Sequence, residues 1–212
     1  IDISEAFLRA NAELLLHEYP GLSIEAVAGE YFDVAAALPA TPPRLILFLG
    51  SNIGNLERLE AVRFLSLLSG QMDESDRLLV GIDLVKDEHV IWRAYNDEQG
   101  VTAEFNKNLL HRINRELDGH FNVDAWEHEA RFDPTEQRVE LRLISMCEQE
   151  VQIEAIGTSY RFVQGESIHT EWSHKYTIES FKGLAARSGL EIDQVWFDDR
   201  QWFASVLLKR SE

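Results

Sequence analysis

The chain has 212 residues, of which 45% are hydrophobic and 27% charged, a composition that suits one large globular domain or one domain carrying an insertion. Lysine and arginine number 20 against 37 aspartates and glutamates, which gives a formal net charge of −17. This acidity argues against nucleic acid or an anionic membrane as a partner, because phosphate contacts need clustered basic side chains.

The cysteine content and the hydropathy pattern indicate the cellular compartment in which the protein is expected. Cys147 has no second cysteine to pair with, and since it lies in a strand-like run we expect a small core residue rather than a nucleophile. No apolar stretch approaches the ~20 residues of a membrane span, and no signal peptide is recognisable. We therefore expect a cytoplasmic location.

The first residues, Ile1 to Ser4, have the pattern of a strand end followed by a helix N-cap at Ser4. A protein rarely begins at the tip of a strand, so we expect this chain to be part of a longer polypeptide that lacks its N-terminal part here.

Helices and strands alternate in the first half of the chain. The spacing of apolar residues predicts helices and strands in the order 5–17 (helix), 22–28 (strand), 32–38 (helix), 44–49 (strand), 56–69 (helix) and 77–83 (strand). This alternation predicts a parallel, doubly wound α/β sheet, and the continuous apolarity of 44–49 predicts a strand buried on both faces.

The pattern changes after Lys86. Two helices, 91–95 and 102–117, precede a run of strands expected at 125–133, 138–146, 151–156, 160–163 and 167–173. A helix over 178–187 and a hairpin of 190–197 with 202–209 then end the chain. We predict a core made of 1–86 and 176–212, and an inserted α+β subdomain over 87–175.

The turn Gly50–Asn55 (GSNIGN) joins an apolar strand to a helix. Such turns form the rim at which open α/β sheets bind ligands, and two glycines let a ligand approach the backbone. The pattern indicates either a ligand site or a tight turn that only connects two elements.

Three further groups carry candidate polar chemistry. Asp2 could accept hydrogen bonds from ribose hydroxyls or cap a helix, and Glu30 with Tyr31 could bind a purine or begin a helix. Thr102, which follows the polar stretch Tyr95–Asp97, could contact a zwitterion or cap the next helix.

A polar cluster, Gly165–Tyr176, lies late in the chain. In a strand, Glu171 and Ser173 share one face, where a carboxylate and a hydroxyl could hold both nitrogens of an imidazole. His169 is expected on that same face, which raises a metal interpretation, although a solvated sheet face explains the pattern as well. No HxH, HExxH or carboxylate triad indicates a metal elsewhere.

Taken in order, these motifs have a family resemblance. The chain resembles the histidine-specific, S-adenosylmethionine-dependent N-methyltransferases of ergothioneine biosynthesis along essentially its whole length, through GSNIGN (50–55), GIDLVKD (81–87), AYND (94–97), GVTA (100–103), FNKNL (105–109), INREL (113–117) and GESIHTEWSHKY (165–176).

The resemblance implies a Rossmann-like class I methyltransferase sheet with an inserted substrate-binding subdomain. It further implies methylation of the α-amine of L-histidine to N,N,N-trimethylhistidine (hercynine), with S-adenosylmethionine as the cofactor and no metal. We expect a monomer that binds this small-molecule substrate. Alternatives are an enzyme of the same fold acting on another amino acid, and a catalytically inert fragment.

The resemblance assigns roles on the cofactor side by motif position. Asp2 resembles the ribose-binding acid, Glu30 and Tyr31 resemble the adenine-side pair, and Gly50 lies at the cofactor-side strand tip. Glu30 stands where Asp is expected, and the family's glycine-rich cofactor loop would precede Ile1.

On the substrate side, Asn55 resembles the amide that holds the amino-acid end and Tyr95 the tyrosine that binds its carboxylate, and these two are the implied catalytic positions. The positions around the imidazole are Thr102, Glu171 and Ser173. Leu141 replaces a pocket Met with little change of volume, and Trp172 sits between the two imidazole contacts.

Overall fold

The structure, a computed structural model, describes residues 1–35, 41 and 43–211. Its largest sheet has the order β1-β2-β9-β8, from β1 (Leu45–Phe48), β2 (Arg77–Asp83), β8 (Leu190–Phe197) and β9 (Phe203–Arg210). β1 is parallel to β2, whereas β9 is antiparallel to both β2 and β8. The described strands thus form a mixed α/β sheet that ends in the expected antiparallel hairpin.

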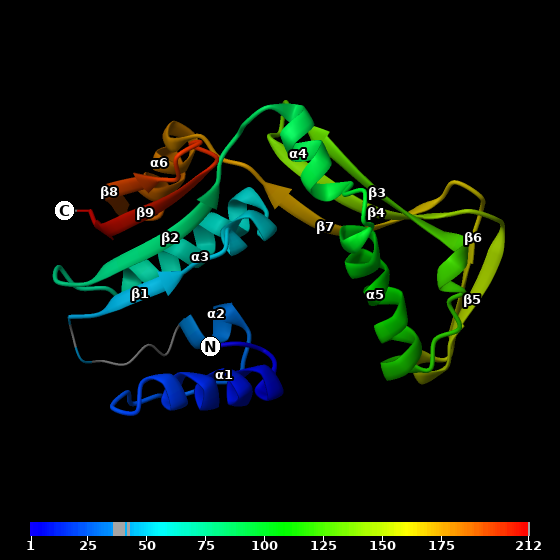
Figure 1. Cartoon of the computed structure of the whole chain (residues 1–212), viewed down its shortest axis with the longest axis horizontal. Helices are drawn as coiled ribbons and strands as arrows, with labels where there is room; N and C mark the ends of the chain where they lie inside the picture. Colours follow the sequence, from blue (N-terminus) through cyan, green and yellow to red (C-terminus); the bar gives the residue numbers. More distant parts are fainter. Residues whose placement is uncertain (36–40, 42, 212) are drawn as a thin grey trace.

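Helices α3 (Arg58–Gln71) and α6 (Ile178–Arg187) pack together against this sheet (Figure 1). Each has a side-chain start signal, since Glu57 forms a capping box with Glu60 and Thr177 forms one with Ser180. The apolar faces of both helices meet alternate residues of β2 and β9 in the main core, where Leu65, Leu78, Val206 and Phe181 are fully buried, among others. Each such side chain contributes roughly 1.5–3 kcal/mol by leaving water.

A second group of elements lies beside this core (Figure 1). It contains the sheet β3-β4-β7, from β3 (Trp126–Asp133), β4 (Arg138–Ser145) and β7 (Ser167–His174), and the hairpin of β5 (Gln149–Ile153) with β6 (Thr158–Phe162). Helices α4 (Glu88–Tyr95) and α5 (Val101–Leu117) and the short 3-10 helices η2 (Val123–Ala125) and η3 (Glu154–Ile156) complete it. We propose that this group is the inserted subdomain of 87–175.

The chain enters and leaves this second group at neighbouring points. Leu84 and Tyr176 form a parallel bridge, in which Tyr176 N donates to Asp83 O at 2.9 Å and Val85 N donates to Tyr176 O at 2.9 Å. The end of β7 is therefore hydrogen-bonded to the end of β2, and residues of both sheets meet there.

The N-terminal part departs most from the sequence predictions. Helix α1 (Glu5–Glu18) forms with Ser4 as its N-cap, but the strand predicted over 22–28 is wrong, because only Ala28 pairs, in an isolated bridge with Asp2. The helix predicted over 32–38 is described only as α2 (Tyr31–Ala35), and the rest of that range lies outside the described residues.

Two predictions of burial are also wrong. Leu45 and Leu47 of β1 are 61% and 56% exposed, and β1 is an edge strand that pairs only with β2 among the described strands. Cys147 is exposed rather than part of a core, since β4 ends at Ser145 and the chain bends away before β5.

Candidate functional site

The turn after β1 has the strained geometry that its glycines suggest. Gly50 and Ser51 both have left-handed backbone angles, φ +72° and +60°, and the 3-10 helix η1 (Asn52–Asn55) follows. The Ser51 hydroxyl accepts the backbone N–H of Asp83 at 2.9 Å, which fixes the turn to the carboxyl end of β2. At Gly54 a Cβ would lie 2.7 Å from His174 O, so only glycine lets η1 pack this closely on β7.

A cavity of about 310 Å³ opens at this point. It lies at the carboxyl ends of β1 and β2, the place where open α/β sheets bind ligands, and its far wall comes from α4 and β7. The sequence predicted several of its residues, namely the substrate contacts Asn55, Tyr95, Glu171 and Ser173 and, on the cofactor side, Gly50. The remaining lining residues are Ser51, Asn52, Asp83, Lys175 and Phe203.

Lys175 is the polar centre of this cavity. Its side chain is 1% exposed, and Nζ lies 2.9 Å from Asp83 Oδ2, 2.6 Å from Tyr95 Oη and 2.7 Å from Ser173 Oγ. The two hydroxyls are 2.8 Å apart, and Lys86 binds the other carboxylate oxygen of Asp83. The buried charge of Lys175 thus has a complete set of acceptors, as burial of a charge requires.

Glu171 has a different environment. Burial raises the pKa of its carboxyl above the usual range, and the positive charge of Lys175 opposes this shift only in part. The side chain is half-buried and lines the cavity, and no hydrogen bond to its carboxylate is found among the described residues. A desolvated carboxylate with unused acceptors can receive N–H groups from a ligand.

His169 does not share the face of Glu171 and Ser173, so that expectation is wrong. Between Leu141 and Arg142 of β4 the register shifts, so that Leu141 pairs with Glu171 but Arg142 pairs with His169. Thr170 is the extra residue of this β-bulge, and a bulge reverses the alternation of side chains along a strand. His169 instead stacks on the Trp172 ring at 4.2 Å on the opposite face.

A second cavity, of about 350 Å³, holds the residues predicted on the cofactor side. Asp2, Glu30 and Tyr31 line it together with Ile3, Gly29, Phe32 and Leu56. Two carboxylates and an aromatic ring suit the hydroxyls and the base of a nucleoside, so these residues fit the adenosyl part of S-adenosylmethionine. Asp2 Oδ1 also accepts the N–H of Ser4, the N-cap residue of α1, at 2.9 Å.

Three predicted positions lie away from both cavities. Thr102 N donates to Asp97 at 2.9 Å at the start of α5, and the bond helps to lower the pKa of Asp97 to about 2. Leu141 is 2% exposed in a small core with Ile91 and Val139. Trp172 stacks under the Arg138 guanidinium at 3.6 Å, on the face of β7 opposite Glu171.

Sequence reasoning missed Lys175 and Asp83 as site residues. A signal for Lys175 was available, because residues 171, 173 and 175 alternate along one strand direction and so share a face. Asp83 is the last residue of a strand predicted correctly as 77–83, and carboxyl ends of such strands line the ligand crevice. Within the described residues no group of three or more His, Cys, Asp or Glu could hold a metal ion.

Comparison with known proteins identifies the family. The family model described as "Histidine-specific methyltransferase, SAM-dependent" matches residues 1–210. The chain belongs to this family. The histidine N-alpha-methyltransferase of Mycolicibacterium smegmatis is 39% identical over 209 residues, an alignment that covers 99% of this chain and 65% of that protein. The chain therefore spans a little under two thirds of the length of this curated relative.

More distant matches have related names. Ergothioneine biosynthesis protein 1 of Neurospora crassa is 27% identical over 78% of this chain and 19% of that protein. L-tryptophan methyltransferase trpM of Psilocybe serbica is 29% identical over 79% of this chain and 47% of that protein. The solved CcbJ methyltransferase of Streptomyces caelestis, 12% identical, has a TM-score of 0.53 over 98% of this chain and 77% of its own, which shows the shared fold.

Proposed function

We propose that the complete protein transfers methyl groups from S-adenosylmethionine to the α-amine of L-histidine and forms N,N,N-trimethylhistidine in ergothioneine biosynthesis. The observation that carries this proposal is the position of the turn after β1. Asn55 lines the cavity of Tyr95 and Glu171, and the next residue, Leu56, lines the cavity of Asp2 and Glu30. The two binding regions are therefore neighbours on either side of one turn, as transfer between two ligands requires.

The chemistry needs little from the protein besides positioning. S-adenosylmethionine supplies an electrophilic methyl group, and the amine must be neutral and in line with it. Asn55 and Tyr95 would hold the amino-acid end of the substrate, while Glu171 would accept a ring N–H. Fixed geometry in a site that excludes water accounts for large rate effects without a covalent intermediate on the protein.

A second candidate is methylation of another amino acid, which the tryptophan methyltransferase relative brings into consideration. The two sequence features that suggested a retuned pocket do not support it. Leu141 is enclosed in the core of the inserted group, and Trp172 faces away from Glu171. The polar lining of the cavity offers both a carboxylate acceptor and hydroxyl groups. It suits an imidazole, which has one N–H donor and one acceptor nitrogen, better than an indole, which has one N–H donor and no acceptor nitrogen.

The test is a methylation assay of the complete protein with S-adenosylmethionine and either L-histidine or L-tryptophan, with products identified by mass spectrometry. We expect mono-, di- and trimethylated histidine, and turnover of tryptophan slower by about 100-fold or more, because the site's buried polar groups would be left unpaired. Preferred turnover of tryptophan would establish the second candidate. The inert alternative concerns this chain alone, and a thermal-shift titration of residues 1–212 that gives no shift with either histidine or S-adenosylhomocysteine would favour it.

We also make proposals on the cellular compartment and the oligomeric state. None of the helices in the described part of the chain is long and apolar enough to cross a membrane. We propose a cytoplasmic monomer, supported by the acidic charge of −17, which disfavours self-association. Cell fractionation and sedimentation velocity of the complete protein test the two points.

A further inference from the structure

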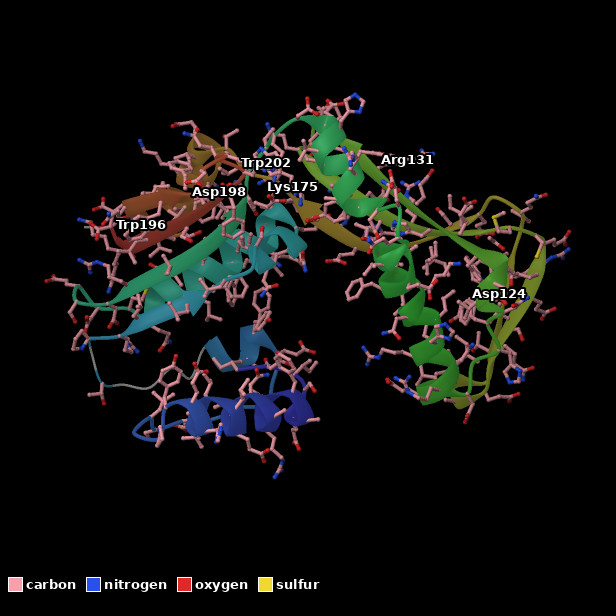
Figure 2. All side chains as sticks on the ribbon, in the orientation of Figure 1. Asp124, Arg131, Lys175, Trp196, Asp198 and Trp202 are labelled. Carbon is pink, nitrogen blue, oxygen red and sulfur yellow. The ribbon has the colours of Figure 1, made fainter. Side chains whose placement is uncertain are left out.

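Lys175 is the only lysine that lines the cavity beside Tyr95 and Glu171 among the described residues. It follows the last residue of β7 and lies where the two groups of elements meet (Figure 2). Its backbone carbonyl accepts a hydrogen bond from Arg58 at 3.2 Å, and its backbone N–H donates to Gln137 O at 2.7 Å. The main chain is thus held from both sides, which fixes the direction of the side chain.

The donors of Lys175 are fully used. An ammonium has three N–H groups, and three oxygens surround Nζ at 2.6 to 2.9 Å, from Tyr95, Ser173 and Asp83. No N–H group remains for a ligand. Lys175 therefore acts on a ligand only through the groups that it holds.

The hydroxyls of Tyr95 and Ser173 have only one hydrogen-bond donor left for a ligand. Tyr95 Oη and Ser173 Oγ each accept one N–H from Lys175, and one of them donates to the other across 2.8 Å. One O–H of the pair is then left over, and no acceptor for it is found among the described residues. This O–H is the single hydrogen-bond donor that the pair presents to the cavity, so the pair can bind an acceptor atom of the ligand.

The charges around the cavity also favour an acceptor group of the ligand beside Tyr95. Lys175 and Lys86 bind the two oxygens of Asp83, so two positive charges face one negative charge at this end of the cavity. Glu171, at the other side of Ser173 along β7, adds a negative charge where ring N–H groups would lie. The cavity is therefore positive at the Tyr95 side and negative at the Glu171 side.

We infer that Lys175 is a positioning residue that selects the substrate's carboxylate: it holds the Tyr95 and Ser173 hydroxyls as a donor and supplies the positive charge behind them. The inference rests on the proposed function, because it names how that site recognises the charged end of an amino acid. Without Lys175, Tyr95 and Ser173 would lose both their fixed direction and the charge that polarises them.

The test compares L-histidine with L-histidinamide, whose amide replaces the carboxylate, by calorimetry on the complete protein saturated with S-adenosylhomocysteine. In Lys175→Met, which keeps the length of the side chain, we expect histidine to bind about tenfold or more weakly and histidinamide to change by about twofold or less. Lys175→Arg, which keeps the charge, should retain most of the preference for histidine. Lys182→Met is the matched control, since it makes the same substitution at an exposed lysine of α6 that lines neither cavity, and it should change the preference by about threefold or less.

The ratio of the two affinities is the deciding quantity because a purely structural role of Lys175 would weaken both ligands equally. Equal weakening in Lys175→Met, or an unchanged ratio, would overturn the inference. If Lys175→Met does not fold, the arginine variant decides, and loss of the preference despite the retained charge would count against the inference. Failure of the unsubstituted protein to bind histidine at all would instead contradict the proposed function on which the inference depends.

Discussion

At the scale of single residues, Glu171 connects burial to recognition. Its carboxylate is desolvated and has unused acceptors, so a ligand N–H would find a strong partner there. We expect Glu171→Ala to weaken histidine binding by about tenfold or more, since hydrogen bonds to charged groups are worth about 1.5–3 kcal/mol. Binding of S-adenosylhomocysteine should change by about twofold or less, because Glu171 does not line the cavity of Asp2 and Glu30. Calorimetry with each ligand measures both, and unchanged histidine affinity would exclude this role.

The burial of another single residue, His174, makes the stability of the folded protein depend on pH. Its side chain is 1% exposed, and neither ring nitrogen has a hydrogen-bond partner among the described residues. Burial, with the positive charges of Arg58, Arg138 and Lys175, lowers its pKa from 6.5 to about 4, while Glu57 Oε2 lies 3.7 Å from Nε2. The folded state therefore prefers the neutral ring.

The sign of the effect follows from proton uptake. Below pH 6.5 the unfolded chain binds a proton that the folded protein does not take up until about pH 4, so stability falls as the pH falls through this window. The loss reaches on the order of 3 kcal/mol at its lower end. We expect His174→Leu to reduce this acid sensitivity in thermal unfolding between pH 7 and pH 4, with the exposed His111→Gln as control. Equal acid sensitivity of His174→Leu and the unsubstituted protein would refute the assignment.

At the scale of elements, the pattern of the chain predicted most helices and strands closely. The strand 77–83 and the helix 178–187 were correct to the residue, because their apolar periodicity and caps act locally. The strand predicted over 22–28 failed because only Ala28 pairs, in a bridge with Asp2, and propensity alone does not make a strand. The bulge at Thr170 could not be predicted from the alternation of residues along the strand. One extra residue reverses the faces of the side chains without changing the composition.

The contact of η1 with β7 is an element-scale feature that a single glycine permits. A Cβ at Gly54 would meet the carbonyl oxygen of His174 at 2.7 Å, and a backbone atom cannot move aside cheaply. We expect Gly54→Ala to destabilise the protein by about 1–3 kcal/mol, as overpacking does. Because Asn55 would shift relative to Glu171, the KM for histidine should rise as well.

Gly70 provides the matched control. It lies in α3, where an added Cβ would have nothing within 4 Å, and it has no left-handed backbone angle. Gly70→Ala should leave the KM unchanged and raise stability by about 0.5–1 kcal/mol, since alanine favours a helix interior. Thermal unfolding and steady-state kinetics of both variants make the comparison, and a Gly54→Ala protein as stable as Gly70→Ala would contradict this account.

At the scale of the whole molecule, the site depends on two separate cores. Asn55 comes from the side of the main core, whereas Tyr95 and Glu171 come from α4 and β7 of the second group. The sequence predicted that these residues gather, through the family resemblance, but not what joins them. Lys175 and Asp83 lie at this joint. The alternation of residues 171, 173 and 175 indicates the face of Lys175, but its 2.9 Å contact with Asp83, across two elements far apart in the sequence, is found only in the structure.

Arg58 is the other group that spans this joint. Its guanidinium donates to Lys175 O at 3.2 Å and to Glu136 O at 3.5 Å, and lies 4.6 Å from the centre of the Tyr176 ring. We expect Arg58→Ala to lower the free energy of unfolding by about 1–3 kcal/mol and to raise the KM for histidine, because α3 would no longer hold the end of β7. The affinity for S-adenosylhomocysteine should stay within about twofold, since Arg58 does not line the cavity of Asp2.

Arg63→Ala, on the exposed face of the same helix, is the control. It should change neither the free energy of unfolding nor the free energy of histidine binding by more than about 0.5 kcal/mol. Chemical unfolding and kinetics of the two variants decide the point, because an Arg58→Ala protein that loses stability but keeps its KM would show that the joint supports the fold without shaping the site.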